Sequence, residues 1–283
     1  WLDASNIDAA SNATFTDGAS VSEWKDLSGN NNNATQTDST KVPVLSNTGM
    51  IDFDTVNDLL NLPDGTVPYG NDSFTIIMTL KLNEPAADHY EVMVAGEYLT
   101  NQQNIISFYK NNKRFYNAWW SHDGYTDNAI SEWGDIYTIV LTYDNTSGRE
   151  FYVDGSKKTL IVNDEFGYGA HNGSSKNNVI GSIRHDNIYQ PDMEIAEILV
   201  FDESLSESEL TNINYYLSKK WGLESKVDSD DDGTLDELDV FPMDATEFED
   251  TDSDGTGNNA DTDDDNDGYS DAVETAAGTS TID

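Results

Sequence analysis

The sequence of 283 residues contains no cysteine, few basic residues and no long apolar run. Without cysteine the chain has neither a disulfide scaffold nor a thiol for catalysis. It carries 14 Lys and Arg against 54 Asp and Glu, a net charge of −40, so nucleic acid and anionic membrane surfaces are excluded as partners because they share its sign. No apolar segment approaches the roughly eighteen residues of a membrane span, and we expect no membrane insertion.

The acidic residues are concentrated at the carboxyl-terminal end of the chain. Residues 227–283 hold 21 Asp and Glu and no Lys or Arg. Because composition changes between Leu223 and Val227, we predict two domains, residues 1–223 and residues 224–283.

Three twelve-residue acidic ladders occupy the second domain. Each copy has oxygen-bearing side chains at positions one, three, five, nine and twelve, and glycine at position six. A calcium ion takes six to eight oxygens at about 2.3–2.6 Å, and glycine permits the sharp bend that such a loop needs. We therefore predict about three or more Ca²⁺ ions, held by Asp228, Asp230, Asp232, Asp236, Asp239, Asp250, Asp252, Asp254, Asn258, Asp261, Asp263, Asp265, Asp267, Asp271 and Glu274.

A disordered acidic tail is the alternative, because blocks of like charge repel one another and stay solvated. Acidity alone would not place Gly233, Gly255 and Gly268 at the sixth position of all three copies. Few apolar residues are available for a core in this segment, so the ions must act as its core. Without them about fifteen neighbouring carboxylates would repel one another.

The run from Asp239 through Val240, Phe241, Pro242 and Met243 to Asp244 leads into the second ladder. Together with the ladders it resembles the bacterial form of thrombospondin type 3 repeats. The resemblance implies successive calcium loops with almost no secondary structure. Animal repeats of this family are braced by cysteines, whereas Ala260 stands where a cysteine could be, so the resemblance implies that metal alone supplies rigidity here.

The first domain shows the alternation of apolar and polar residues that is typical of β-strands. It is clearest over residues 74–82, which predicts a half-buried strand, and it recurs over residues 104–109, 114–120, 136–143, 150–153 and 194–201. Asp154 and Gly155 predict a two-residue hairpin turn that leads to a strand around Leu160. We predict an all-β fold, a two-sheet antiparallel sandwich. One helix follows it, because Ser206 and Glu209 form a capping box and Gly222 can end the helix.

Short motifs follow one another in this domain at residues 1–5, 24–33, 51–54, 151–155 and 195–206. In this order they resemble the laminin-G-like, concanavalin A-type jelly rolls of exported bacterial proteins, over about residues 1–223. The resemblance implies a jelly-roll sandwich that binds a glycan or a protein.

Two segments combine aromatic and polar residues in the way that sugar binding requires. The first contains Trp119, Trp120, His122 and Tyr125. Neighbouring residues of a strand face opposite sides, so Trp119 and Trp120 cannot both be core, although the outer one could pack under a loop. The second segment contains Arg184 and His185, and the alternative for it is an ordinary solvated loop.

The sequence contains no recognisable set of catalytic residues. Glu194 and Glu197 are the nearest approach to a paired carboxylate motif, but a separation of three places them on opposite faces of a strand. No Gly-x-Ser-x-Gly motif occurs, and the four histidines show no zinc spacing. We therefore predict that the chain is not an enzyme.

These features together predict a calcium-stabilised, lectin-like carbohydrate-binding module, with the ladders as a calcium-stiffened spacer toward other domains of a larger protein. A protein-binding adhesin with a receptor partner is the first alternative, and a polysaccharide-degrading enzyme is the second. Weak calcium loops need millimolar calcium, which exists outside cells, so we expect a secreted or cell-surface location.

Overall fold

The computed structural model describes residues 1–54, 56–86, 88–96, 103–119, 123–162, 177–181 and 189–283. They divide into two compact units, one formed by Trp1–Val153 and Lys157–Leu205, the other by Asp154–Ser156 and Ser206–Asp283. The predicted all-β fold with two antiparallel sheets and a following helix is confirmed. No helix in the described part of the chain is both long enough and apolar enough to cross a membrane.

Eight described strands form the first sheet, in which β1 (Leu2–Asp3) lies beside β17. The order of the others is β14 (Ser156–Lys158), β13 (Gly148–Val153), β12 (Ile136–Asp144), β7 (Phe74–Leu82), β17 (Met193–Phe201), β5 (Ile51–Phe53) and β4 (Val44–Leu45). Nine described strands form the second sheet. Their order is β15 (Ile161–Val162), β11 (Gly124–Thr126), β10 (Arg114–Ala118), β9 (Gln103–Tyr109), β8 (His89–Gly96), β16 (Asn178–Gly181), β6 (Leu59–Leu62), β3 (Ala34–Thr35) and β2 (Glu23–Trp24).

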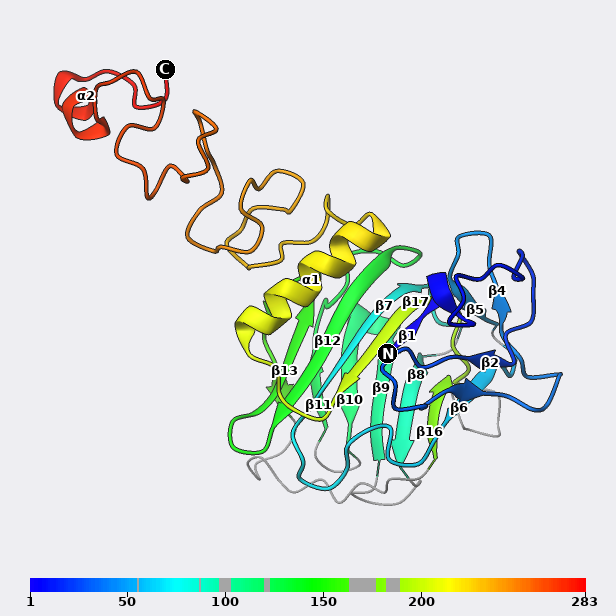
Figure 1. Ribbon diagram of the computed structural model, residues 1–283. Coiled ribbons are helices and arrows are strands. Elements are labelled where there is room, and N and C mark those ends of the chain that lie inside the picture. The colour runs from blue at the N-terminus through cyan, green and yellow to red at the C-terminus, as the bar shows by residue number, and fades with distance from the viewer. Residues whose placement is uncertain (55, 87, 97–102, 120–122, 163–176, 182–188) are drawn as a thin grey trace. The chain divides into compact units, whose positions relative to one another are not determined.

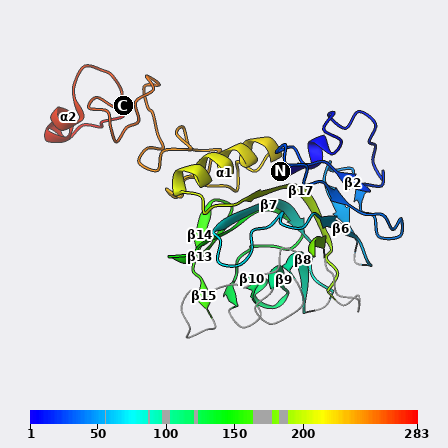
Figure 2. The same cartoon turned by 60° about the horizontal axis from the view of Figure 1, so that its bottom comes forward.

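The two sheets form two layers, with β7 and β17 in one and β8, β9 and β10 in the other (Figure 2). Apolar side chains from both sheets meet between the layers. Phe115 of β10, for example, lies edge-on against Phe151 of β13 with ring centroids 4.7 Å apart, and both are fully buried. The inward face of each strand is therefore identified by its contacts, and the next residue along the strand faces outward.

Strand β7 is buried on both faces, so the prediction of a half-buried strand is wrong. Its polar residues Thr75 and Thr79 are also buried, and their hydroxyls pair with threonines of β12. Thr79 shares a hydrogen bond with Thr138 (3.1 Å), and Thr75 donates to Thr142 (3.2 Å). Hydroxyl pairs across neighbouring strands satisfy polar groups that water does not reach.

The predicted hairpin turn is confirmed, because Asp154 and Gly155 both have positive φ, 51° and 83°. The strand that follows is β14, not a strand around Leu160 as predicted. Strand β15 instead pairs with β11 in the other sheet. The chain therefore crosses from one sheet to the other just after β14.

The helix that follows the sandwich, α1 (Glu207–Trp221), begins and ends as predicted. The hydroxyl of Ser206 accepts from the backbone of Glu209, the Glu209 carboxylate accepts from the backbone of Ser206, and Gly222 ends the helix at φ 67°. A second helix, α2 (Asp271–Ala277), lies in the third ladder and was not predicted. Two 3₁₀ turns, η1 (Ala4–Asn6) and η2 (Asn111–Lys113), complete the described helical segments. Both α-helices are labelled in Figure 1.

A bulge in β17 corrects the prediction for its two glutamates. The register shifts between Ile195 and Glu197, so that Glu194 lies opposite Lys81 and Glu197 lies opposite Thr79. Lys81 and Thr79 are two residues apart on β7, and both glutamates therefore face the same side of the sheet. Both are engaged: Glu194 accepts from Lys81 at 2.5 Å, and Glu197 accepts from the indole of Trp1 at 2.6 Å.

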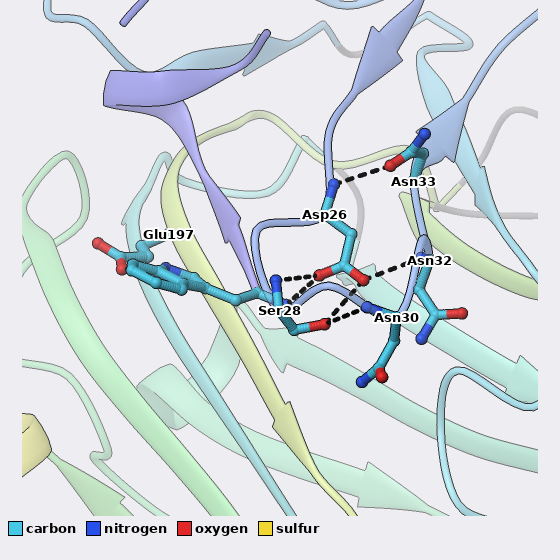
Figure 3. A network of polar contacts seen from close by, with 7 residues as sticks. Asp26, Ser28, Asn30, Asn32, Asn33 and Glu197 are labelled. Carbon is cyan, nitrogen blue, oxygen red and sulfur yellow. Dashed lines mark hydrogen bonds and ion pairs between the residues drawn. The ribbon is translucent and has the colours of Figure 1, made fainter. Parts of the chain in front are cut away.

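The loop after β2 is organised by the Asp26 carboxylate, whose side chain is only 1% exposed (Figure 3). It accepts hydrogen bonds from the backbone and hydroxyl of Ser28 and from the backbone of Asn32 at 2.8–2.9 Å. Burial acts to raise the pKa of Asp26, but these hydrogen bonds, with one from the Trp1 ammonium at 3.0 Å, outweigh it and lower the pKa to about 2. The ionised carboxylate therefore stabilises the folded loop.

We expect Asp26→Asn to lower the free energy of unfolding by about 1–2 kcal/mol at neutral pH, from the size of the pKa shift. A depressed pKa contributes stability that is full above the unfolded value of 3.8 and lost as pH falls through the folded value of about 2. The difference between variant and wild type in urea unfolding should thus shrink between pH 4 and pH 2. The exposed Asp17→Asn is the control, and an equal effect of both changes would contradict this role of Asp26.

Candidate metal loops and a candidate ligand-binding row

The three ladders share one backbone conformation. Position four is left-handed in each copy, at Asp231 (φ 60°), Ser253 (φ 64°) and Asn266 (φ 58°). The glycine at position six also has positive φ, 103°, 93° and 96° in the three copies. Two left-handed residues separated by one other residue bend each chain segment around a common centre, as the spacing of the glycines predicts.

The backbone of each loop orients its first carboxylates. The N–H of the position-six glycine donates to the position-one carboxylate, over 2.9 Å to Asp228, 3.0 Å to Asp250 and 3.1 Å to Asp263. The N–H of position five donates to the position-three carboxylate in the same way, for example from Asp254 to Asp252 at 2.9 Å. At Asp250 and Asp263 the other side-chain oxygen remains for a ligand, whereas both oxygens of Asp228 accept a backbone hydrogen bond, one from Gly233 and one from Asp232 at 3.2 Å.

The carboxylates at positions one, three and five come together in all three copies. Their oxygens lie within 4.8 Å of one another in the groups Asp228, Asp230, Asp232; Asp250, Asp252, Asp254; and Asp263, Asp265, Asp267. Each group could hold a metal ion. A set of anionic oxygens with no nitrogen or sulfur is the donor set of a hard cation and fits calcium.

Buried oxygens without partners support this fit. Among the described residues, one carboxylate oxygen of each of six predicted ligand residues is buried and accepts no hydrogen bond: Asp230, Asp239, Asp250, Asp252, Asp263 and Glu274. Buried polar atoms in folded proteins are normally paired, and an ion is one way to satisfy them. Asp230 is only 9% exposed, so water cannot readily take the place of a ligand there.

Electrostatics in the first ladder agree with this geometry. Burial and the negative charges of Asp232 and Asp239 raise the pKa of Asp230 to about 6. Burial also raises the pKa of Asp228, Asp239 and Glu274, and neighbouring carboxylates add to it. Clustered carboxylates of this kind are destabilised as anions until a cation lies between them.

The side chains at position nine connect the two ends of each loop. The side chains of Asp236, Asn258 and Asp271 accept a hydrogen bond from the backbone N–H of position two, over 2.9, 2.9 and 3.0 Å. They brace the loops from outside the clusters at positions one, three and five. Ser229 and Thr251 at position two also bond their position-nine partners through their hydroxyls, and these hydroxyls were the sequence signal for a brace.

Position twelve differs between the copies. Asp239 and Glu274 each have a buried oxygen without a partner in the described part of the chain. Asp261 has no such oxygen, and like Asp239 it accepts hydrogen bonds from the backbone that follows it, here from Thr262 and Asp263. In the second ladder position twelve thus contributes no such oxygen, and position nine carries no charge because it is Asn258.

A row of aromatic rings crosses the second sheet. It runs from Tyr189 to His89 of β8, Tyr109 of β9, Tyr116 of β10 and Tyr125 of β11. Successive ring centroids are 4.2, 4.4, 5.0 and 6.1 Å apart, and every ring is half-buried. We call these five residues the aromatic row.

The aromatic row lies on the outer face of the sheet. Phe108 and Phe115 are fully buried and stack on each other, and Phe115 also contacts the other sheet through Phe151. Tyr109 and Tyr116 follow these residues directly in the sequence, so they face the opposite side. Partly exposed rings on an outer sheet face form an apolar surface that a ligand can reach.

Hydrogen bonds hold the middle of the row in place. Tyr116 donates its hydroxyl proton to Asp123 at 2.5 Å, and Asp123 also accepts from the backbone of Trp119 at 3.0 Å. Burial and this hydrogen bond raise the pKa of Tyr116. At the end of the row, the guanidinium of Arg114 lies 3.9 Å above the ring of Tyr125 and is paired with Asp127.

The predicted ligand residues differ in where they lie: one is in the aromatic row, one is buried, and four are outside the described residues. Tyr125 belongs to the aromatic row. Trp119 is 2% exposed, with Arg149 4.2 Å above its ring and Tyr143 edge-on at 4.8 Å, so it lies in the interior and offers no surface platform, contrary to prediction. Trp120, His122, Arg184 and His185 lie outside the described residues. Tyr116 lies in the same aromatic segment as Tyr125, whereas His89 and Tyr109 were not predicted, because only the pairing of strands brings them beside it.

No family model and no curated protein matches the chain. Solved structures do: a sialidase of Trypanosoma rangeli superposes with a TM-score of 0.53 at 18% identity, and its complex with sialic acid superposes with 0.51 at 17%. A mutant of that sialidase displaying trans-sialidase activity gives 0.51 at 16%. Each match covers 73% of this chain but only 32% of the sialidase. At this identity the likeness shows a shared β-sandwich fold.

Proposed function

We propose that the chain is a calcium-stabilised carbohydrate-binding module. In this proposal residues 1–223 form a laminin-G-like jelly roll that binds glycan, and residues 224–283 form thrombospondin type 3-like calcium loops that act as a spacer. Carboxylates at positions one, three and five of each loop, joined by Asp239 and Glu274, hold the ions. Calcium loops of this type work at millimolar calcium, and we therefore place the protein outside the cell or on its surface.

The aromatic row is the observation that carries the glycan proposal. Sugars present flat apolar faces and a rim of hydroxyls, and they pack on half-exposed rings flanked by polar groups. Five neighbouring rings offer a surface for several sugar units, with Arg114 and Asp127 beside one end. The sialidase neighbours, one of them in complex with sialic acid, support a carbohydrate-related role in general.

Binding without catalysis fits the same residues better than an enzyme does. A tyrosine that acts as a nucleophile needs a lowered pKa, whereas the pKa of Tyr116 is raised by burial and by Asp123. A general-acid glutamate needs a raised pKa, whereas the hydrogen bonds to Glu194 overcome its burial and lower the pKa. We propose that the chain releases no product from polysaccharides, which a reducing-sugar assay checks directly.

We expect the double variant Tyr109→Ala, Tyr116→Ala to lose glycan binding by about tenfold or more, because each ring contributes about 1 kcal/mol of stacking. The measurement is a glycan array of neutral and acidic polysaccharides with labelled protein in millimolar calcium. Tyr216→Ala, which removes an exposed tyrosine from α1, is the matched control.

The two ways in which this prediction can fail are distinct. If wild-type protein binds no glycan on the array, the carbohydrate proposal is wrong, and capture of a protein receptor becomes the test of the adhesin alternative. If wild type and double variant bind equally, the module binds glycan through another surface.

A further inference from the structure

A cleft of about 200 Å³ opens where the two sheets end together. Its apolar floor comes from both layers, with Leu62 at the end of β6 and Ile198 and Val200 on β17. Its rim is polar and is formed by Asn30, Asn32, Thr66 and Asp202. The aromatic row, on β8 to β11, does not line this cleft.

Hydrogen bonds with Asp26 hold the loop that carries Asn30 and Asn32. Asp26 fixes the main chain at Ser28 and Asn32, and its own N–H donates to Asn33. The side chains of Asn30 and Asn32 point away from the Asp26 carboxylate (Figure 3). Within the described residues neither side-chain amide makes a hydrogen bond, so two donors and acceptors are placed in advance without a partner.

Two other residues of the rim supply acceptors. Asp202 follows β17 directly, is exposed, and carries a carboxylate that can accept two hydrogen bonds. The hydroxyl of Thr66 donates to the carbonyl of Pro63 at 2.8 Å, which leaves its lone pairs for a ligand. Two amides, a carboxylate and a hydroxyl in the lining of one cleft can pair with a ring that carries several hydroxyl groups.

We propose that this cleft binds one neutral monosaccharide unit, at a site separate from the aromatic row. The hydroxyls would pair with Asn30, Asn32 and Asp202, and one apolar face would rest on Leu62 and Val200. The volume is below the roughly 300–1,000 Å³ of pockets for drug-sized ligands, which suits a single ring. Asp202 and the net charge of −40 oppose an anionic sugar, so the cleft selects against sialic acid and uronic acids.

The test is saturation-transfer NMR and calorimetry of the full chain in calcium, with methyl glycosides of neutral hexoses and with sialic acid. We expect at least one neutral glycoside to bind and sialic acid not to bind. Asp202→Ala should weaken neutral binding about tenfold, since a hydrogen bond to a charged group is lost, and Asn30→Ala should weaken it less. Glu203→Ala, the neighbouring exposed carboxylate, is the control and should bind as wild type does.

Several results would overturn this site. They are absence of neutral glycoside binding, preference for sialic acid, or equal affinity of wild type and both cleft variants. Polysaccharide binding on the array is measured separately with the tyrosine variants. Failure of the cleft therefore leaves the proposed function standing, and failure of the proposed function does not decide the cleft.

Discussion

Removal of calcium with excess EGTA is expected to expand residues 224–283 while the sandwich stays folded. The segment has few apolar residues, and its carboxylates lie within 4.8 Å of one another in three groups. Without cations these groups repel, and a segment of this length expands by up to about twofold in radius when it unfolds. Small-angle scattering in calcium and in EGTA measures the change, and tryptophan fluorescence follows the sandwich.

Proteolysis gives a second measurement, provided that the protease suits the sequence. Residues 227–283 contain no Lys or Arg, so trypsin cannot report on them. A glutamate-specific serine protease can cut after Glu237, Glu247, Glu249 and Glu274, and it should do so rapidly only in EGTA. Equal compactness and equal cleavage in both conditions would show that the segment holds its shape without metal.

The order in which the ions leave should follow the chemistry of the three loops. Calcium affinity depends on the number of charged ligands and on the rigidity of the site. The second ladder has neutral Asn258 at position nine, and its position-twelve residue Asp261 has no buried oxygen without a partner, unlike Asp239 and Glu274. We expect it to release calcium first in a titration, with the buried first ladder retaining its ion longest. Asp230→Asn should weaken the first site, whereas Asp244→Asn, outside the ligand positions, should leave all three unchanged.

The sequence predicts the secondary structure correctly wherever the pattern depends on residues that are close together in the chain. Alternation over residues 74–82, the hairpin at Asp154 and Gly155, and the cap at Ser206 depend on neighbours within a few positions, and each produced the expected element. The burial of Thr75 and Thr79 could not be predicted from the sequence. Their hydroxyls are satisfied by threonines about sixty residues away, and only the register of β7 and β12 brings them into contact.

The bulge in β17 shows how one irregular residue makes a prediction from residue spacing fail. Spacing alone places Glu194 and Glu197 on opposite faces, but the irregularity between Ile195 and Glu197 reverses the alternation. The residue types in this strand do not indicate the bulge. Spacing therefore no longer separates the two glutamates, which in the structure are engaged by Lys81 and by the indole of Trp1.

The two candidate sites also differ in whether the sequence alone could predict them. Each metal loop takes its ligands from twelve consecutive residues, so the sequence could predict the carboxylate clusters. The aromatic row takes its rings from four strands and from Tyr189, and spacing within any one strand cannot predict it. Tyr125 was found because it lies in an aromatic segment, whereas His89 is recognisable only beside Tyr109.

Gly155→Ala is expected to be among the most damaging single substitutions in the chain. Gly155 has φ 83°, and an added Cβ would lie 1.7 Å from the carbonyl oxygen of Asp228. That oxygen belongs to the backbone and cannot rotate away, so the turn and the first ladder must move apart. We expect a loss of about 3–4 kcal/mol, at the upper end for a single residue, and a fall of tenfold or more in calcium affinity at the first ladder.

The reason for both effects is that Asp228 serves two structures at once. Its backbone N–H donates to the carbonyl of Asp154 in the turn at 3.3 Å, and its carboxylate is the first member of a metal cluster. Gly49→Ala is the matched control, because Gly49 has nearly the same φ, 81°, but nothing within 4 Å of the added Cβ. The control should show only the strain of about 1–2 kcal/mol of a left-handed alanine, with unchanged calcium titration. Equal loss in the two variants would mean that backbone strain, not the approach of Asp228, accounts for the requirement for glycine at position 155.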